Sequence, residues 1–115
     1  MTYVDGVITA VPTANKQAYI DYSRQCEAIF REHGATGYVD CWGDDVPAGK
    51  VTDYARAVQA TEDETITFGW VAWPDKATRD AGWAKIMQDE RMTKMSMPFD
   101  GKRMVYGGFE AVVGG

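Results

Sequence analysis

Three charged residues stand in segments rich in β-branched and aromatic side chains, where they could carry proton-transfer chemistry. Asp5 lies in the first such segment, Asp40 in a second and Arg56 in a third. A carboxylate whose pKa is raised by burial can act as a general base toward an acidic carbon or a phenol. The alternative is an ion-pair network in which Arg56 joins the two aspartates and sets the register between two subunits. The sequence leaves both interpretations open, with Asp5 and Asp40 as catalytic candidates.

The chain has one histidine, His33, which is followed directly by Gly34. One histidine cannot supply a multi-histidine site, and no Cys-x-x-Cys pair replaces it, so we expect no metal and no cofactor. His33 falls in the last turn of an expected helix, where the helix dipole favours a cation. Capping is therefore the first interpretation of this histidine. A catalytic role as a proton shuttle, or haem ligation, is the alternative.

Two further catalytic or binding motifs are excluded by their surroundings. Neither serine, Ser23 or Ser96, has the Gly-x-Ser-x-Gly context of a nucleophile. Residues 43–52 contain a Gly-Lys pair, as phosphate loops do, but their spacing is too long, Val51 occupies the Ser/Thr position and a strand is expected to follow. We therefore expect neither serine catalysis nor phosphate binding.

Length and charge restrict the class of protein further. The 115 residues fit one domain over 1–115, and the net charge of −5 argues against nucleic acid or anionic lipid as the main partner. No apolar run reaches the ~18–20 residues that span a bilayer, and the N-terminal stretch is unlike a secretory signal. Cys26 and Cys41 fit no zinc or redox spacing, which is typical of buried thiols in a reducing compartment. We expect a cytoplasmic protein without membrane contact.

Hydrophobic periodicity and turn residues predict the elements that must position these side chains. The expected strands are 3–11, 35–43, 52–60, 65–73 and 102–113, and the expected helices are 13–32, with Thr13 as N-cap, and 75–89, with Asp75 as N-cap. Gly107 and Gly108 predict a bulge or a close approach within the last strand. This order predicts an α+β fold of the ferredoxin-like βαββαβ type with an extra strand, an antiparallel sheet and both helices on one face.

Alternation along the strands predicts two different sheet faces. We assign to the helix side the set that is mainly apolar: Val4, Ile8, Val39, Cys41, Phe68, Trp70, Val105 and Phe109. The helix-free side then receives the mixed set: Tyr3, Asp5, Val7, Tyr38, Asp40, Trp42, Tyr54, Arg56, Thr67, Val71, Met104 and Tyr106.

So many aromatic side chains on an open face are most simply explained by a second copy, which predicts a homodimer through this face. A cavity between the two sheets would be a by-product of that stacking. The candidates for ligand contact in it are Tyr38, Trp42, Tyr54, Arg56 and Tyr106.

A set of short motifs over nearly the whole chain resembles a bacterial family of unknown function, of similar length, in the dimeric α/β-barrel superfamily. The motifs are YVDG at 3–6, VP at 11–12, HGA at 33–35, GDDVP at 43–47, GKVT at 49–52, RDA at 79–81, MPFDGKRM at 97–104 and GGFE at 107–110. The resemblance implies a ferredoxin-like protomer and a dimer whose sheets face each other. It implies no activity, because the family has none assigned.

Three functional hypotheses follow. The first is a dimeric barrel that binds a small organic molecule between its sheets. The second is a cofactor-independent monooxygenase or isomerase-like enzyme acting on a small aromatic or acidic-carbon substrate, by analogy with other members of the superfamily. The third is a structural or regulatory dimer without a pocket. Whether the protein is an enzyme stays open at this point.

Overall fold

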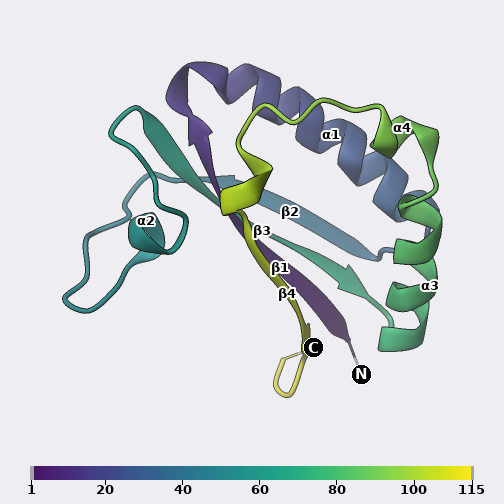
Figure 1. Ribbon diagram of the computed structural model, residues 1–115. Coiled ribbons are helices and arrows are strands. Elements are labelled where there is room, and N and C mark those ends of the chain that lie inside the picture. Colours follow the sequence, from purple (N-terminus) through teal and green to yellow (C-terminus); the bar gives the residue numbers. More distant parts are fainter. Residues whose placement is uncertain (1, 115) are drawn as a thin grey trace.

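The computed structural model describes residues 2–114, and its centre is a four-stranded sheet in the order β2-β3-β1-β4 (Figure 1). The strands are β1 (Tyr3–Pro12), β2 (Gly37–Trp42), β3 (Glu64–Trp73) and β4 (Val105–Glu110). Every neighbouring pair is antiparallel, and β1 pairs with β3 over its whole length. The α+β class and the antiparallel sheet predicted from the sequence are therefore confirmed.

The helices lie mainly on one face of this sheet, where α1 and α3 form a layer above it (Figure 1). They are α1 (Lys16–Glu32), α3 (Lys76–Ile86) and the short α4 (Glu90–Thr93), with 3-10 turns η1 (Thr13–Asn15) and η2 (Gly101–Arg103). A further short helix, α2 (Tyr54–Ala57), belongs to the long connection between β2 and β3. Within residues 2–114, the helices are all too short or too polar to cross a membrane.

The predicted helix boundaries are correct where local chemistry determines them. The Asp75 carboxylate accepts a hydrogen bond of 2.7 Å from the Thr78 backbone N–H and so caps α3, as expected. Gly34 adopts a φ of 111° directly after α1, the left-handed conformation that ends helices. Thr13 does not cap α1; it begins the 3-10 turn η1 instead.

The apolar stripe of α1 packs on the sheet as its spacing predicts. Tyr19, Cys26, Ile29 and Phe30 are buried, whereas Ala18 is exposed. The Phe30 ring contacts three aromatic rings of the core: Tyr38, Trp73 and Trp83. This aromatic cluster joins α1 and α3 to the strands β2 and β3.

The strand predicted at 52–60 is wrong, because a local cap competes with β-structure there. The Asp53 carboxylate accepts a 2.7 Å hydrogen bond from the Arg56 backbone N–H, which closes the short helix α2. The last strand is shorter than predicted, since residues 101–103 form η2. Gly107 and Gly108 pair in register with β1 and form no bulge. A Cβ atom on Gly108 would lie 2.6 Å from the Tyr3 hydroxyl oxygen, so this glycine permits a close side-chain approach.

The predicted assignment of the two sheet faces is also wrong. The members of the mixed set on β1 and β2 face the helices: Asp5 accepts a hydrogen bond from Trp83 of α3, and Asp40 accepts one from Ser23 of α1. The apolar set occupies the helix-free face, where Phe68 is 42% exposed, Trp70 38% and Phe109 61%. The inner sides of α1 and α3 carry a hydroxyl group and an indole N–H group, which need polar partners when they are buried. The aspartates of the mixed set provide these partners, and these members of the mixed set therefore lie under the helices.

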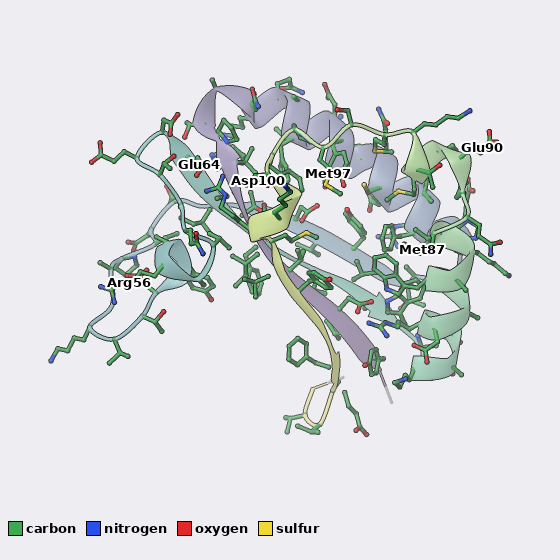
Figure 2. The ribbon with its side chains drawn as sticks, viewed as in Figure 1. Arg56, Glu64, Met87, Glu90, Met97 and Asp100 are labelled. Carbon is green, nitrogen blue, oxygen red and sulfur yellow. The ribbon has the colours of Figure 1, made fainter. Side chains whose placement is uncertain are left out.

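A charged cluster fastens the start of β3 to the segment before β4. Two hydrogen bonds, of 2.6 and 2.8 Å, join the Arg103 guanidinium to the Glu64 carboxylate. Arg103 also donates to Asp100 and to the backbone carbonyl of Gln59. Figure 2 shows Glu64 and Asp100 at the same end of the sheet. The contact with Arg103 lowers the pKa of Glu64 from 4.5 to about 2.

We predict that this cluster contributes to acid sensitivity. Because the pKa of Glu64 is lower in the folded chain, its contribution is fully present above about pH 4.5 and is lost as the pH falls toward 2. Glu64→Gln should lower the free energy of unfolding at pH 7 by about 1 kcal/mol. In this variant the free energy of unfolding should also decrease less steeply below pH 4.5 than in the wild type. Urea unfolding at several pH values measures both effects. Glu62→Gln, at an exposed neighbouring position, is the control. Parallel pH profiles for the wild type and Glu64→Gln would contradict the assignment.

Candidate functional site

Asp5 lies at the centre of a hydrogen-bond network between β1, β3 and α3. Its carboxylate accepts indole N–H bonds of 2.9 Å from Trp73 and 2.8 Å from Trp83. Arg79 adds a bond of 2.7 Å and, through Nε, one of 3.1 Å, and its guanidinium lies 5.2 Å from the centroid of the Tyr3 ring. The contact with Asp5 raises the pKa of Arg79. With both oxygens occupied by these donors, Asp5 holds α3 against the sheet.

Arg56 lies far from both aspartates. It belongs to α2, at the end of the molecule away from the helix layer (Figure 2). Its guanidinium is 3.5 Å from Asp53 and donates to the carbonyl oxygens of Gly49 and Lys50. Within residues 2–114 no ion pair joins Arg56 to Asp5 or Asp40, so the ion-pair network that the sequence offered does not form inside one subunit.

His33 is the C-cap residue of α1, and its backbone N–H donates to the carbonyls of Ile29 and Phe30. Its imidazole Nε2 lies 3.0 Å from the Asp89 carboxylate, which Arg91 also binds at 2.7 Å. Arg91 and His33 lower the pKa of Asp89 through these contacts. The side chain of His33 thus ties the end of α1 to the junction between α3 and α4, as expected for a residue in a capping position.

Asp40 lies in a different environment, at the base of a cleft between α1 and the edge strand β2. The Ser23 hydroxyl donates a hydrogen bond to its carboxylate. The cleft has a volume of about 230 Å³, and its walls are formed by Tyr19, Ile20, Ser23, Arg24, Glu27, Tyr38, Asp40, Cys41 and Trp42. We call it the α1–β2 cleft. Its lining combines two carboxylates, one guanidinium, three aromatic rings and the Ser23 hydroxyl in a space of ligand size.

The groups around Asp40 are held in their protonated forms. Burial raises the pKa of Tyr19 and of Tyr38, and the negative charge of Asp40 raises both further. Burial also raises the pKa of the Cys26 thiol, and a buried protonated thiol is a poor nucleophile. The phenols can therefore donate hydrogen bonds. Of the two carboxylates in the lining, Glu27 forms an ion pair with Arg31, and Asp40 accepts the hydrogen bond from Ser23.

A second, smaller cleft lies on the helix-free side of β2. Its volume is about 170 Å³, and it is lined by Cys41, Trp42, Gly43, Val46, Tyr54, Ile66 and Phe68. The Tyr54 and Phe68 rings meet edge-to-face with centroids 6.4 Å apart. This cleft is apolar, and it is continuous with the exposed apolar face of the sheet.

The residues predicted to contact a ligand are divided among these places. Tyr38 and Trp42 line the α1–β2 cleft beside Asp40, whereas Tyr54 lines the apolar cleft. Arg56 lines neither of these two clefts, and Tyr106 lies on β4, 74% exposed. Within residues 2–114, no group of three or more His, Cys, Asp or Glu side chains is arranged to hold a metal ion.

Sequence reasoning missed Tyr19 and Ser23 as parts of the site. Their positions in the sequence could have identified them. Both lie on α1 at spacings that direct them toward the sheet, and a hydroxyl group on the sheet-facing side of a helix needs a polar partner. It missed Arg79 and Trp83 in the same way. These two residues are four positions apart on α3, so they reach the same carboxylate.

Comparison with known proteins places the sequence among proteins without an assigned activity. Residues 2–101 match the family described as "Protein of unknown function (DUF1428)". Over 115 residues the chain is 50% identical to "Uncharacterized protein YbaA" of Escherichia coli strain K12, with 98% of each chain covered. The proteins of that name from E. coli O157:H7 and Shigella flexneri match with the same identity and coverage.

Proposed function

The chain belongs to the DUF1428 family of proteins of unknown function, and from its geometry we propose that it is a homodimer that binds a small organic molecule in the α1–β2 cleft of each subunit. The observation that carries the binding proposal is the combination of Asp40 with the Tyr19, Tyr38 and Trp42 rings in one cleft. Aromatic walls with a few convergent polar groups are the usual composition of ligand sites.

The position of the ligand differs from the one that the sequence suggested. A site between two stacked sheets would need polar groups on the helix-free face, but that face is apolar, and the mixed set of side chains lies under the helices. The α1–β2 cleft supplies the polar groups, and it is present in a single subunit. Binding in this cleft therefore needs no residue from a second copy.

The helix-free face supports assembly with a second copy of the chain. Phe68 and Trp70 of β3 are exposed there, and so are Val105 and Phe109 of β4, with β1 between these two strands. The molecule measures 38 × 35 × 20 Å along its principal axes. A stable dimer buries about 800 Å² per subunit, which such a face can supply. An isologous contact would cover the same patch on both copies.

The strand order supports the finer fold proposal. The chain contains two β-α-β units, β1-α1-β2 and β3-α3-β4. In the order β2-β3-β1-β4, β3 lies between the strands of the first unit and β1 between those of the second, and all neighbours run antiparallel. This is the arrangement expected of a ferredoxin-like protomer. Two such protomers joined through their helix-free faces would form a dimeric α/β barrel over the whole chain.

Enzymatic proton transfer is a second candidate function of the same cleft. Within residues 2–114, Asp40 is not in an ion pair, so its carboxylate is available to accept a proton from an acidic carbon of a bound molecule. The protonated Tyr38 phenol beside it could stabilise the charge that develops. Solvent deuterium entering the bound molecule would distinguish this function from simple binding.

The binding proposal is tested with single-ring aromatic probes, because the volume of the cleft fits one ring. We expect benzyl alcohol or a charged analogue, titrated into ¹⁵N-labelled protein, to shift amide signals of residues that line the cleft. Ser23→Trp should fill the cleft and weaken binding by about tenfold or more, a loss of at least about 1.4 kcal/mol.

Ser96→Trp is the matched control, since it places the same side chain at the other serine, on an exposed segment. Circular dichroism checks that both variants fold. Equal affinity of the two variants, or signal shifts confined to the helix-free face, would overturn binding in this cleft.

A further inference from the structure

Three charged side chains line the α1–β2 cleft: Arg24, Glu27 and Asp40. Glu27 forms an ion pair with Arg31, at 3.1 Å. Arg24 lies at the exposed rim, and in the described part of the chain no basic side chain forms an ion pair with Asp40. The Ser23 hydroxyl satisfies one hydrogen-bond position of the Asp40 carboxylate but does not neutralise it. The base of the cleft therefore favours a positively charged group.

The aromatic walls favour the same sign of charge. The Lys16 ammonium lies 5.6 Å from the centroid of the Trp42 ring, within the range of a cation–π contact. The Trp42 ring itself packs against Tyr19, with centroids 6.0 Å apart. The chain thus already places one of its own cations against a ring that lines the cleft, and the remaining ring surfaces are of the type that binds cations.

Volume limits the size of the occupant. The cleft encloses about 230 Å³, and an apolar cavity of about 150 Å³ is sufficient to bind benzene. The larger volume of the cleft leaves space for a ligand with one aromatic ring and a short substituent. A cation of this size can place its charged group on Asp40 and its ring between the aromatic walls.

We infer that the α1–β2 cleft selects a small organic cation, of the aryl-alkyl ammonium class, whose ammonium group pairs with Asp40 while its ring packs against Tyr19 and Trp42. The inference rests on the proposed function, because it names the class of molecule that the same cleft binds. It also assigns opposite effects to the two charged residues. Asp40 attracts the ligand, and Arg24 at the rim repels it.

The test compares three probes that share one ring and differ in charge: benzylamine, benzyl alcohol and benzoate. Titrations of the wild-type protein should give at least tenfold tighter binding of benzylamine than of benzyl alcohol, with benzoate weakest, since a charge-assisted hydrogen bond exceeds a neutral one. Asp40→Asn keeps an oxygen for Ser23 and should abolish the preference for benzylamine. Arg24→Gln should tighten benzylamine binding a few-fold.

Asp21→Asn, on an exposed position of the same helix, is the matched control and should change none of the affinities. If benzyl alcohol or benzoate binds in the cleft at least as tightly as benzylamine, the cation inference is overturned while the proposed binding function stands. If none of the three probes binds, both are overturned. The comparison of probes on the wild-type protein decides the matter even if Asp40→Asn does not fold.

Discussion

Trp70→Glu is expected to convert the proposed homodimer into a monomer. Trp70 lies on the central strand β3, pairs in register with Gly6 and Val39, and contacts the Phe68 ring, with centroids 6.1 Å apart. A carboxylate at this position would be buried without a partner in the proposed dimer. Loss of an aromatic anchor near the centre of an interface costs about 3 kcal/mol, or ~100-fold in the dissociation constant, before the charge is counted.

Sedimentation equilibrium measures this effect directly. The wild type should sediment at twice the 12.7 kDa chain mass and Trp70→Glu at 12.7 kDa. Met87→Glu is the matched control, because Met87 is also exposed but lies at the end of α3, in the helix layer (Figure 2). Arg56→Ala should also leave the mass unchanged, since its partners belong to its own loop. A monomeric wild type, or a dimeric Trp70→Glu, would exclude assembly through this face.

Asp5→Ala should produce the largest loss of stability among the single substitutions considered. It removes the acceptor for two indole N–H groups and for the Arg79 guanidinium at once. Asp5 and Arg79 are only 12% and 24% exposed, so water replaces these contacts incompletely. Breaking a largely buried ion pair costs about 3–5 kcal/mol, and the partial access of water to Arg79 places the expected loss at about 3 kcal/mol.

Urea unfolding at one fixed protein concentration measures this loss, because an assembling protein changes its stability with concentration. Asp80→Ala is the control: Asp80 also contacts Arg79, and Lys76 as well, but at an exposed position, so its loss should stay below about 1 kcal/mol. Asp5→Asn should fall between the two, since it keeps one acceptor oxygen. A loss below 1 kcal/mol for Asp5→Ala would show that the network does not hold α3.

The elements that the sequence predicted correctly are those with a strong local signal. The stripe on α1, the Asp75 cap and the Gly34 stop each depend on residues close in the chain, and the four observed strands follow from runs of β-branched and aromatic residues. The strand predicted at 52–60 failed for a local reason too. In that short segment, the cap formed by Asp53 contributes more to the stability of the local structure than β-propensity alone.

The faces of the sheet could not be derived from alternation alone. Period-two patterning separates two sets of side chains but does not say which set meets the helices, and here both sets carry aromatic rings. The deciding information lies on the helices: Ser23 on α1 and Trp83 on α3 need acceptors, which Asp40 and Asp5 provide. Matching polar groups between elements would have selected the correct face.

The candidate site was predicted in part. Asp40, Tyr38 and Trp42 were all named from the sequence, and they line one cleft because alternate residues of β2 point to the same side. Arg56 and Tyr54 were placed beside them because a strand was predicted at 52–60. Residues 54–57 form α2 instead, and the cleft does not contain these two side chains. The contribution of α1 to the cleft depends on how the helix packs, which is a long-range property.

Strand β2 alone separates two surfaces for which different occupants are proposed: the α1–β2 cleft, for a small molecule, and the helix-free face, for a second copy of the chain. Tyr38 and Asp40 line the α1–β2 cleft, Val39 belongs to the opposite side, and Cys41 and Trp42 border the clefts on both sides. A backbone shift that accommodates a molecule on one side therefore displaces the side chains on the other. If the proposed ligand and the proposed second copy both bind, ligand affinity and subunit association belong to one thermodynamic cycle, in which each changes the other by the same factor.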